Sequence, residues 1–453
     1  MRLSVLICCV VVCCGTACTQ RHQSLTDEAL AAALGPELAA CVSLQLHGLP
    51  TDVEPLPNNV LTLELVIRES LRTNPSIQSA MARVLIAGAE SQQARLLPNP
   101  ILTVVLRFPE SGGQPIIEAG IAAELLSLLQ QPGRISAADH RLRAASFEAV
   151  TIVLDVLSEA QEQYASAQAL ESRVSILKER RRILERLTDL ADARLKAGEG
   201  TRLDLTTLEA QAAQLDVELL QASLSHRRAM LALARLIGRP SHDADWATAP
   251  SQPPTLNTID ESRWVAAALE RRPEIQSQIA RLAALGVEVN LARGAILDSS
   301  SAGIDSEREG EWSVGPSLSA PLPIMDWGQA KRRKAEAQRL EAMHELTAIR
   351  RSVIQDVRVA YAALQIAQQS LSSANDRMIP LLERRRSEAQ AIYKAGQSDA
   401  VGLLLADQEF HAGRATLIEL QQAATEAVIR LHRAAGGPGH VPEDHEQAPE
   451  VSP

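Results

Sequence analysis

The sequence predicts a mainly α-helical protein with a small β part, built as a tandem repeat of long coiled-coil hairpins. Hydrophobic residues make up 46% of the 453 residues but aromatic residues only 2%, and a core with few rings is typical of long helices packed through Ala and Leu. Apolar residues recur at alternating intervals of four and three, the heptad spacing of a left-handed coiled coil. Two unlike motifs also recur at one fixed offset, which indicates a duplicated unit.

The duplication is visible in two places. The Lys-Ala-Gly motif at residues 196–198 returns at 394–396, and the Pro-X-Ile-Gln-Ser motif at 75–79 returns at 273–277. Both offsets are 198 residues (394 − 196 and 273 − 75). A period this long is not that of a solenoid, so each copy is expected to be one supersecondary unit. The expected divisions are a leader at 1–18, an N-terminal lead at 19–59, the first copy at 60–240, a linker at 241–260, the second copy at 261–437 and a disordered tail at 438–453.

Each copy is expected to contain a helix, two strands, a very long helix, a glycine turn and a return helix. In the first copy, Thr62 is the expected N-cap of a helix that ends at Pro98, since two prolines in three residues stop a helix. Gly198 suits the position after a helix C-terminus, where a left-handed backbone is common. The other elements of this copy are expected at 101–108 and 116–126 (strands), 133–197 (long helix) and 204–237 (return helix).

The second copy repeats this order from residue 261. Its first helix is expected to end near Gly294 and its return helix near Ala435, with strands at 296–305 and 312–322 around a polar loop. Its long helix, from Gly328 to Ala395, has a strict four-three seam: Ala360, Leu364, Ala367, Leu371, Ala374, Met378 and Leu381. The first long helix has a comparable seam: Leu170, Val174, Leu177, Leu184, Leu187 and Ala191.

The N-terminus is interpreted as a secretion signal. A basic start precedes an unbroken apolar run from Val5 to Cys14, which is too short to span a bilayer as a helix. Small residues then lead to Cys18, as in bacterial lipoprotein signals, so Cys18 is the expected lipidated residue; a plain signal peptide cleaved nearby is the alternative. Five of the 6 cysteines lie at or before position 18, so Cys41 has no partner for an intrachain disulfide or a thiolate metal site.

The motifs of several function classes are missing. The glycines at 198 and 200 lack the third glycine of a dinucleotide loop, and neither Gly-X-Ser-X-Gly nor His-Glu-X-X-His occurs. We therefore expect no enzyme, no cofactor and no metal site. The net charge of −10 argues against a nucleic-acid partner. The segment 242–245 is interpreted as polar filler in the linker, and the histidines at 432, 440 and 445 as part of a solvated tail or a metal-binding tail.

One segment carries a specific resemblance. Residues 318–329 form an apolar strand that ends in Pro-Leu and is followed by Asp-Trp-Gly and a basic helix start. With the Leu-Leu-Pro-Asn-Pro segment at 96–100 and the two Lys-Ala-Gly turns, the chain resembles the TolC-type outer-membrane efflux channels over about residues 60–437. The Pro-Asn-Pro segment is similar to the heavy-metal branch of that family.

The resemblance implies a homotrimer, in which three chains with two repeats each form a twelve-stranded barrel in the outer membrane and an α-helical periplasmic tunnel. It also implies a passive duct that docks, tip to tip, onto a periplasmic adaptor protein and an inner-membrane efflux pump. Four strands per chain are too few to close a barrel alone, because the smallest barrels have about eight. The alternative is a periplasmic coiled-coil scaffold or adaptor in which the strand-like segments are loops.

The resemblance also implies the site residues. The adaptor-binding tips fall on the two glycine turns: Leu195, Lys196, Ala197, Gly198, Tyr393, Lys394, Ala395 and Gly396. The gate of the family falls on Asp204 and Tyr393, and the alternative is that both residues only cap and pack the hairpin. The basic partner after the second glycine is replaced by Ser398, and the acidic ring of the entrance by Gly402 and Leu405, so that ring is missing.

Overall fold

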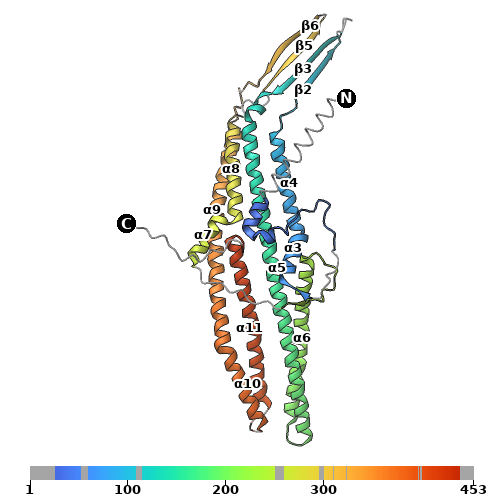
Figure 1. Ribbon diagram of the computed structural model, residues 1–453, viewed down its shortest axis with the longest axis vertical. Helices are drawn as coiled ribbons and strands as arrows, with labels where there is room; N and C mark the ends of the chain where they lie inside the picture. Colours follow the sequence, from blue (N-terminus) through green and yellow to red (C-terminus); the bar gives the residue numbers. More distant parts are fainter. Residues whose placement is uncertain are drawn as a thin grey trace, which may run out of the picture. The chain divides into compact units, whose positions relative to one another are not determined.

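The protein is mainly helical, with one small antiparallel sheet (Figure 1). The computed structural model describes residues 26–52, 60–108, 115–249, 260–294, 300–309, 311–322, 324–395, 397 and 400–438. The predicted leader with Cys18, half of the predicted linker, most of the predicted tail, Gly396 and Ser398 lie outside the described residues. Near the N-terminus, residues 26–34 are helical and a short helix α2 covers Pro36–Ala39.

The chain folds into two compact units, and each takes segments from both halves of the sequence. The first unit contains residues 26–30 with Ser79–Thr151 and Pro273–Ser352. The second contains Ala31–Gln78, Ile152–Arg272 and the chain from Val353 onward. The two long helices, α5 (Leu125–Lys196) and α9 (Gln329–Ser373), each contribute residues to both units.

The first unit carries the sheet, whose strand order is β2-β3-β5-β6 with every neighbouring pair antiparallel. The strands are β2 (Ile101–Arg107), β3 (Ile116–Glu124), β5 (Ser301–Glu309) and β6 (Glu311–Ser319). The polar loop expected at 307–311 was wrong, because β5 and β6 continue through most of it as paired strands.

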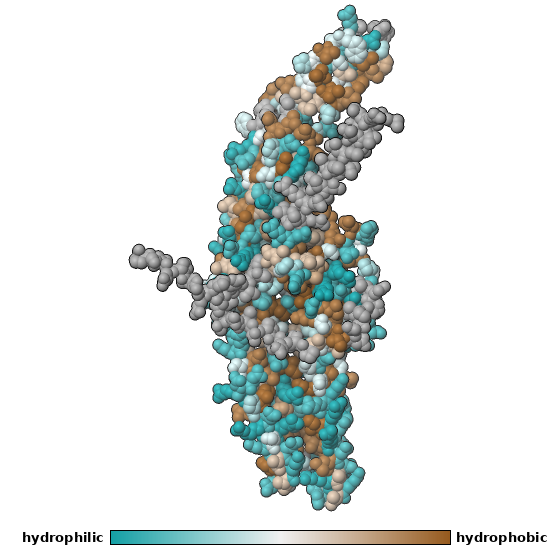
Figure 2. All heavy atoms as spheres, viewed as in Figure 1, coloured by the Kyte–Doolittle hydropathy of each residue, from teal (hydrophilic) through white to brown (hydrophobic). Residues whose placement is uncertain are grey.

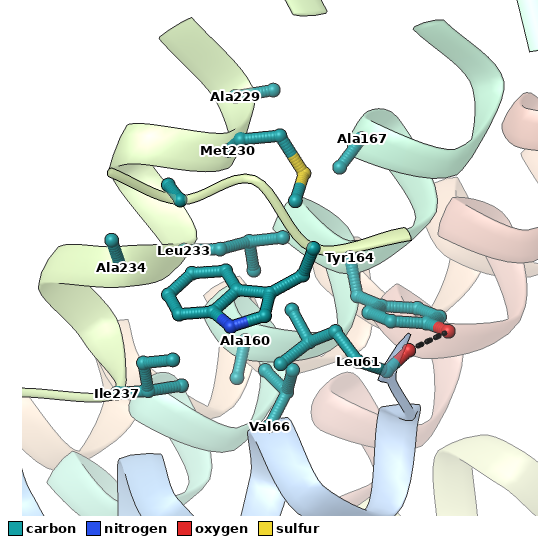
Figure 3. Close-up of a cluster of buried hydrophobic side chains, with 12 residues drawn as sticks. Leu61, Val66, Ala160, Tyr164, Ala167, Ala229, Met230, Leu233, Ala234 and Ile237 are labelled. Carbon is teal, nitrogen blue, oxygen red and sulfur yellow. Dashed lines mark hydrogen bonds between the residues drawn. The ribbon is translucent and has the colours of Figure 1, made fainter. Parts of the chain in front are cut away.

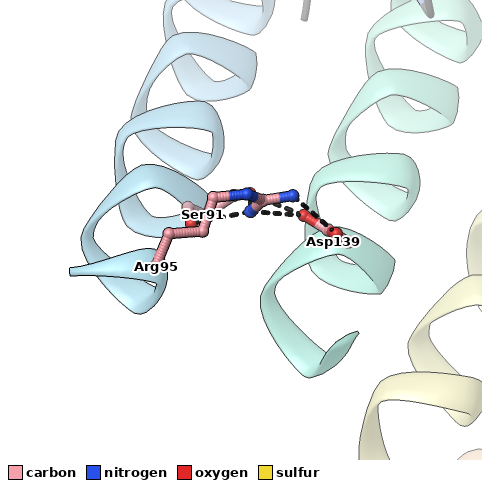
Figure 4. A network of polar contacts seen from close by, with 3 residues as sticks. All are labelled: Ser91, Arg95 and Asp139. Atoms are coloured by element: carbon pink, nitrogen blue, oxygen red, sulfur yellow. Dashed lines mark hydrogen bonds and ion pairs between the residues drawn. The ribbon is translucent and has the colours of Figure 1, made fainter. Parts of the chain in front are cut away.

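Helices α4 (Pro75–Arg95) and α8 (Pro273–Arg293) pack beside α5 and α9 in this unit. A polar network joins α4 to α5 (Figure 4): the Arg95 guanidinium lies 2.9 Å from the Asp139 carboxylate, which also accepts a 2.6 Å hydrogen bond from Ser91. Ser91 is fully buried, so its hydroxyl has a partner where water is excluded.

Two of the expected helices are each divided into two by a break. The helix expected from Leu61 to Pro98 breaks at Asn74, whose backbone is extended, into α3 (Leu63–Thr73) and α4. The residue before a proline avoids the helical region, and the side chain of Asn74 accepts a 2.8 Å hydrogen bond from Ser76 N–H at the start of α4. The same break separates α7 (Glu261–Arg271) from α8, at Arg272. The predicted N-cap Thr62 is confirmed, since it accepts from Leu65 N–H at 3.3 Å.

Helix α5 begins at Leu125 rather than at Gly133, and it contains Pro132. Gly133 serves helix packing instead of marking the start of the helix: a Cβ at this position would lie 2.7 Å from the Leu291 side chain of α8. The glycine therefore allows α5 and α8 to approach closely.

The second unit has a core between α5 and α6 (Arg202–Leu236) that also takes in the start of the predicted linker. Strand β1 (Val60–Leu61) pairs in parallel with β4 (Ala247–Thr248), and the buried Tyr164 hydroxyl donates to Leu61 C=O at 3.1 Å (Figure 3). Trp246 is 4% exposed in this core and stacks on His242 at 4.6 Å. Residues 242–246 are thus structural, and the interpretation of this segment as polar filler was wrong.

The predicted seams are confirmed over most of their length. From α5, Leu177, Leu184 and Ala191 pack against Leu208, Leu215 and Ala222 of α6, each set at intervals of seven. The second seam is buried at Ala360, Leu364, Ala367 and Ala374 and half-buried at Leu371, but Leu381 is 61% exposed. A π-helical turn η2 (Ala374–Met378) separates α9 from α10 (Ile379–Lys394), and its extra residue turns the following seam toward Leu382, which contacts Gly413 of α11 (Ala400–Ala435).

Candidate functional site

The first glycine turn joins α5 to α6 and closes the end of α5 tightly. Gly198 has φ 78°, as predicted, and Glu199 N–H donates to Arg194 C=O at 2.9 Å while Gly198 N–H donates to Leu195 C=O at 3.1 Å. These two bonds form a Schellman motif. Lys196, Ala197 and Gly198 are exposed, so three of the four predicted tip residues of this turn are accessible.

The second turn joins α10 to α11 and has a counterpart of the bond between Glu199 and Arg194. Gln397 N–H donates to Ile392 C=O at 3.1 Å, 198 residues after the equivalent pair. Lys394 and Ala395 are exposed, whereas Tyr393 is 5% exposed. The buried Tyr393 ring therefore seats the turn, and its neighbours are free to meet a partner.

Lys196 is held within its own helix. Its ammonium lies 2.6 Å from the Asp192 carboxylate, one helical turn earlier, and this hydrogen bond raises the pKa of Lys196. A cation in the last turn also suits the negative end of the helix dipole. The first turn therefore presents a fixed positive charge beside its exposed glycine.

The predicted gate residues have different environments in a single chain. Asp204 forms a capping box with Thr201, whose hydroxyl donates to Asp204 Oδ2 at 2.6 Å and whose N–H donates to the same oxygen at 3.2 Å. The Tyr393 ring lies under the guanidinium of Arg194, with 4.7 Å from Cζ to the ring centroid. Within the described residues, Asp204 Oδ1 accepts no hydrogen bond.

Sequence reasoning missed Arg194. One signal was available: Lys196 has Asp192 four residues earlier, but Arg194 has Leu190 and Gly198 at those spacings, so no carboxylate of its own helix lies one turn away. Such an arginine is available to a neighbouring element.

The acidic residues near the second turn do not rebuild a ring at the entrance. Asp407 is 5% exposed and its carboxylate lies 3.0 Å from Arg386 Nε, so its charge is used inside the hairpin. Gly402 and Leu405 hold the positions of the missing pair. His432 is likewise not in a tail: it lies in α11 near Trp264, and burial lowers its pKa. Among the described residues, no group of three or more His, Cys, Asp or Glu side chains is arranged to hold a metal ion.

The sheet has one apolar face. Alternation along the strands, combined with the cross-strand register, places apolar side chains of all four strands on the same side. Most of them are at least 55% exposed (Figure 2): Leu102, Val104, Leu106, Ile121, Ile304, Trp312, Val314 and Leu318. A contiguous exposed patch of this kind marks a surface that lipid or another chain covers.

The opposite face of the sheet is polar and hollowed. A depression of about 700 Å³ lies over it, and its lining includes Thr103, Glu118, Ser301, Asp305, Glu307, Ser313 and Ser317. Glycines on this face allow close approach: the Asp305 carboxylate lies so near Gly120 that a Cβ there would meet Oδ1 at 1.9 Å. The sheet thus has one polar face and one apolar face.

The helices of the second unit also leave apolar side chains uncovered. On α6 these form a ridge at intervals of three, four and seven: Val217, Leu220, Leu224 and Leu231. Between α9 and α11 lies a groove of about 680 Å³, lined mainly by small and apolar residues that include Val359, Ala363, Ile366, Ala423 and Ala427. Both features run along helices for about 20 Å, at 1.5 Å per residue.

No described helix combines the length and the apolar character needed to cross a membrane. Comparison with known proteins gives a match to one family model. The family model described as "Outer membrane efflux protein" matches residues 264–437.

Individual relatives agree with that match. The chain is 24% identical over 381 residues to the cobalt-zinc-cadmium resistance protein CzcC of Cupriavidus metallidurans, covering 83% of this chain and 90% of CzcC. It is 26% identical to the pyoverdine export outer membrane protein OpmQ of Pseudomonas aeruginosa, over 65% of this chain and 64% of OpmQ. The fold is similar to the solved structure of the outer-membrane channel OprN, with a TM-score of 0.71, 20% identity and 84% and 91% of the two chains covered.

The first turn yields a stability prediction. Gly198→Ala meets no atom within 4 Å, so its cost is that of a side chain at positive φ, about 1 kcal/mol. The matched control is Gly286→Ala, which also meets no atom but lies inside α8, where alanine is favoured by about 0.5–1 kcal/mol. In detergent, the midpoint temperature of thermal unfolding should be lower than that of the wild type for the first variant and higher for the second. Equal shifts of the same sign would contradict the role of the left-handed turn.

Proposed function

Because the chain belongs to the outer membrane efflux protein family, we propose that three copies of it form one exit duct of a tripartite efflux system. The protein is an outer-membrane efflux channel, and the match to CzcC places it in the heavy-metal branch. In the proposal, an inner-membrane pump delivers substrates through a periplasmic adaptor, and the duct itself is passive. Each chain contributes a tandem duplication of one helix–sheet unit, supported by α4 and α8, which start 198 residues apart (273 − 75) and contain 21 residues each.

The two-faced sheet is the observation that carries the proposal. Its apolar outer face suits lipid, and its polar inner face suits a water-filled lumen. The edge strands β2 and β6 each have one side without a partner strand in the described chain, and unpaired backbone groups are costly in a bilayer. Three chains, joined β2 to β6, supply twelve strands and remove every edge.

The helices offer a second contact between copies. The α6 ridge presents large side chains such as Leu220 and Leu224, which are 72% and 52% exposed. The groove between α9 and α11 is lined by small ones such as Ala363 and Ala427. Large residues set into a small-residue groove at heptad spacing are the knobs and holes of a coiled coil. We propose that the ridge of one copy packs into the groove of the next around the ring.

The trimer is directly testable. Native mass measurement of the detergent-extracted outer-membrane fraction is expected to give three chains. Leu220→Asp combined with Leu224→Asp puts charges into the proposed contact and should lower the trimer fraction. The matched control is Leu46→Asp, a residue that is 79% exposed away from the ridge. A soluble monomer as the only species would overturn the proposal and favour a periplasmic scaffold.

The exposed residues of the two turns are the proposed adaptor-binding tips. The exposed residues are Lys196, Ala197, Gly198, Lys394 and Ala395. The proposed tips also include Leu195, Tyr393 and Gly396. Their supporting feature is accessibility next to two tightly closed helix ends, which hold the backbone in one shape for a partner.

Asp204 and Tyr393 form the proposed latch of the entrance. In a trimer, the Tyr393 hydroxyl of one hairpin donates to Oδ1 of Asp204 on a neighbouring hairpin, since the Thr201 bonds both end on Oδ2. Such a bond contributes about 1.5–3 kcal/mol where shielded from water. Three copies favour the closed state strongly enough to make the open state a minority.

The latch predicts a conductance change. Tyr393→Phe combined with Asp204→Ala is expected to raise single-channel conductance in planar bilayers, with the trimer intact. Because Asp204 also caps α6, Thr201→Ala controls for loss of the cap alone. Equal conductance of the double variant and the wild type would show that these residues only cap and pack the hairpin.

Cys18 is the proposed lipid anchor, on the strength of the apolar run that ends in small residues before it. One acyl chain anchors only marginally, so several chains and the barrel would share the attachment. Mass spectrometry of the mature N-terminus is expected to show an acylated Cys18. An unmodified N-terminus at another residue would remove the anchor and leave the channel standing.

A further inference from the structure

A contact between Arg194 and Tyr393 joins the ends of the two hairpins of one chain. Arg194 lies in the last turn of α5 and Tyr393 in the last turn of α10. The repeat offset makes Ile392 the counterpart of Arg194 and Leu195 the counterpart of Tyr393 (392 − 194 and 393 − 195 are both 198). The duplication therefore does not repeat this pair: the cation occurs only in the first copy of the motif and the ring only in the second.

The geometry is that of a cation–π interaction. The guanidinium carbon of Arg194 lies 4.7 Å from the centroid of the Tyr393 ring, inside the limit of about 6 Å for such contacts. Arg194 forms no ion pair with any described residue, so the ring is the partner of its charge. Its backbone is fixed as well, because Arg194 C=O accepts the hydrogen bond from Glu199 N–H in the first turn.

Tyr393 in turn seats the end of α10. Between residues 387 and 395 it is the one buried side chain, and its neighbour Ile392 is 45% exposed. Without this contact, the last two turns of α10 and the second glycine turn have no buried side chain among those residues. The Arg194 guanidinium covers the ring, so it also decides how firmly the second turn is held against the first.

We propose that Arg194 is a positioning residue that clamps the second turn to the first through the Tyr393 ring and so favours the closed entrance of the duct. The clamp rests on the proposed function, and it acts within one chain through the ring. The latch to Asp204 acts through the Tyr393 hydroxyl and not through the ring, so the two are separable by mutation.

The test is a set of single-channel conductances in planar bilayers. Arg194→Gln and Tyr393→Leu are each expected to raise conductance, by roughly two- to tenfold if the loss is that of an ordinary cation–π contact. The double variant should do no more than Tyr393→Leu alone, because Tyr393→Leu already removes the ring contact together with the hydroxyl of the latch. Arg194→Lys, which keeps the charge, should recover part of the closed behaviour. Tyr393→Phe keeps the ring, so Arg194→Gln must still raise conductance in that background.

The matched control is Arg202→Gln, which removes an exposed charge beside the same turn. Hydrogen exchange in detergent gives a readout that needs no insertion into bilayers. The Gln397 amide, bonded to Ile392 C=O, should exchange faster in Arg194→Gln than in the wild type, and no faster in Arg202→Gln.

Several results would overturn the clamp. They are an unchanged conductance and exchange rate in Arg194→Gln, an equal effect of Arg202→Gln, or fully additive effects of Arg194→Gln and Tyr393→Leu. A merely structural role would lower thermal stability and leave conductance unchanged. A wild type that forms neither trimer nor channel would overturn the proposed function itself, which is a different outcome from a working channel that ignores Arg194.

Discussion

The open edges of the four-stranded sheet constrain the rest of this molecule. The order β2-β3-β5-β6 leaves one side of β2 and one side of β6 without a partner strand in the described chain. Most soluble sheets protect such edges with charges, prolines or covering loops. Here the neighbouring side chains are instead sorted, apolar on the outer face and polar on the inner one, and the backbone is free for further pairing. That combination fits a sheet that is completed by other copies of the same chain.

The helices meet the same demand in another way. Their seams use Ala and Leu at heptad spacing. This spacing lets helices of 35 residues or more, such as α6 and α11, pack side by side without aromatic side chains. Where Pro380 would interrupt the second seam, one π-helical turn takes up an extra residue and the packing resumes at Leu382. At the turns, the two hairpins meet in a cation–π contact between Arg194 and Tyr393.

The features that local chemistry determines were predicted from the sequence. Thr62 caps a helix because its hydroxyl reaches the N–H three residues on, and Gly198 ends one because it tolerates a positive φ. The heptad seams were predicted as far as the period stayed at seven. These properties depend on neighbours within a few residues, which a sequence displays directly.

Several of the errors involved contacts between distant segments. The start of α5 was placed at Gly133 instead of Leu125, because the packing partner of this glycine, Leu291, is far away in the chain. Trp246 was assigned to a linker because only the pairing of β1 with β4 explains its burial. The exposure of Leu381 follows from a change of helix type that periodicity alone does not predict. At the candidate site, the turns were located correctly, whereas Arg194 was missed because its partner lies on the other hairpin.

The most direct test of this account is the accessibility of alternate residues along β2. Single cysteines at positions 102 to 106, in a Cys41→Ser background, would be treated in proteoliposomes with a membrane-impermeant maleimide. The account predicts labelling at 103 and 105, on the hollowed face, and none at 102, 104 and 106, on the apolar face, because a thiol in lipid neither ionises nor meets the reagent. Uniform labelling of all five positions, or the opposite alternation, would contradict a sheet whose apolar face lies against the membrane.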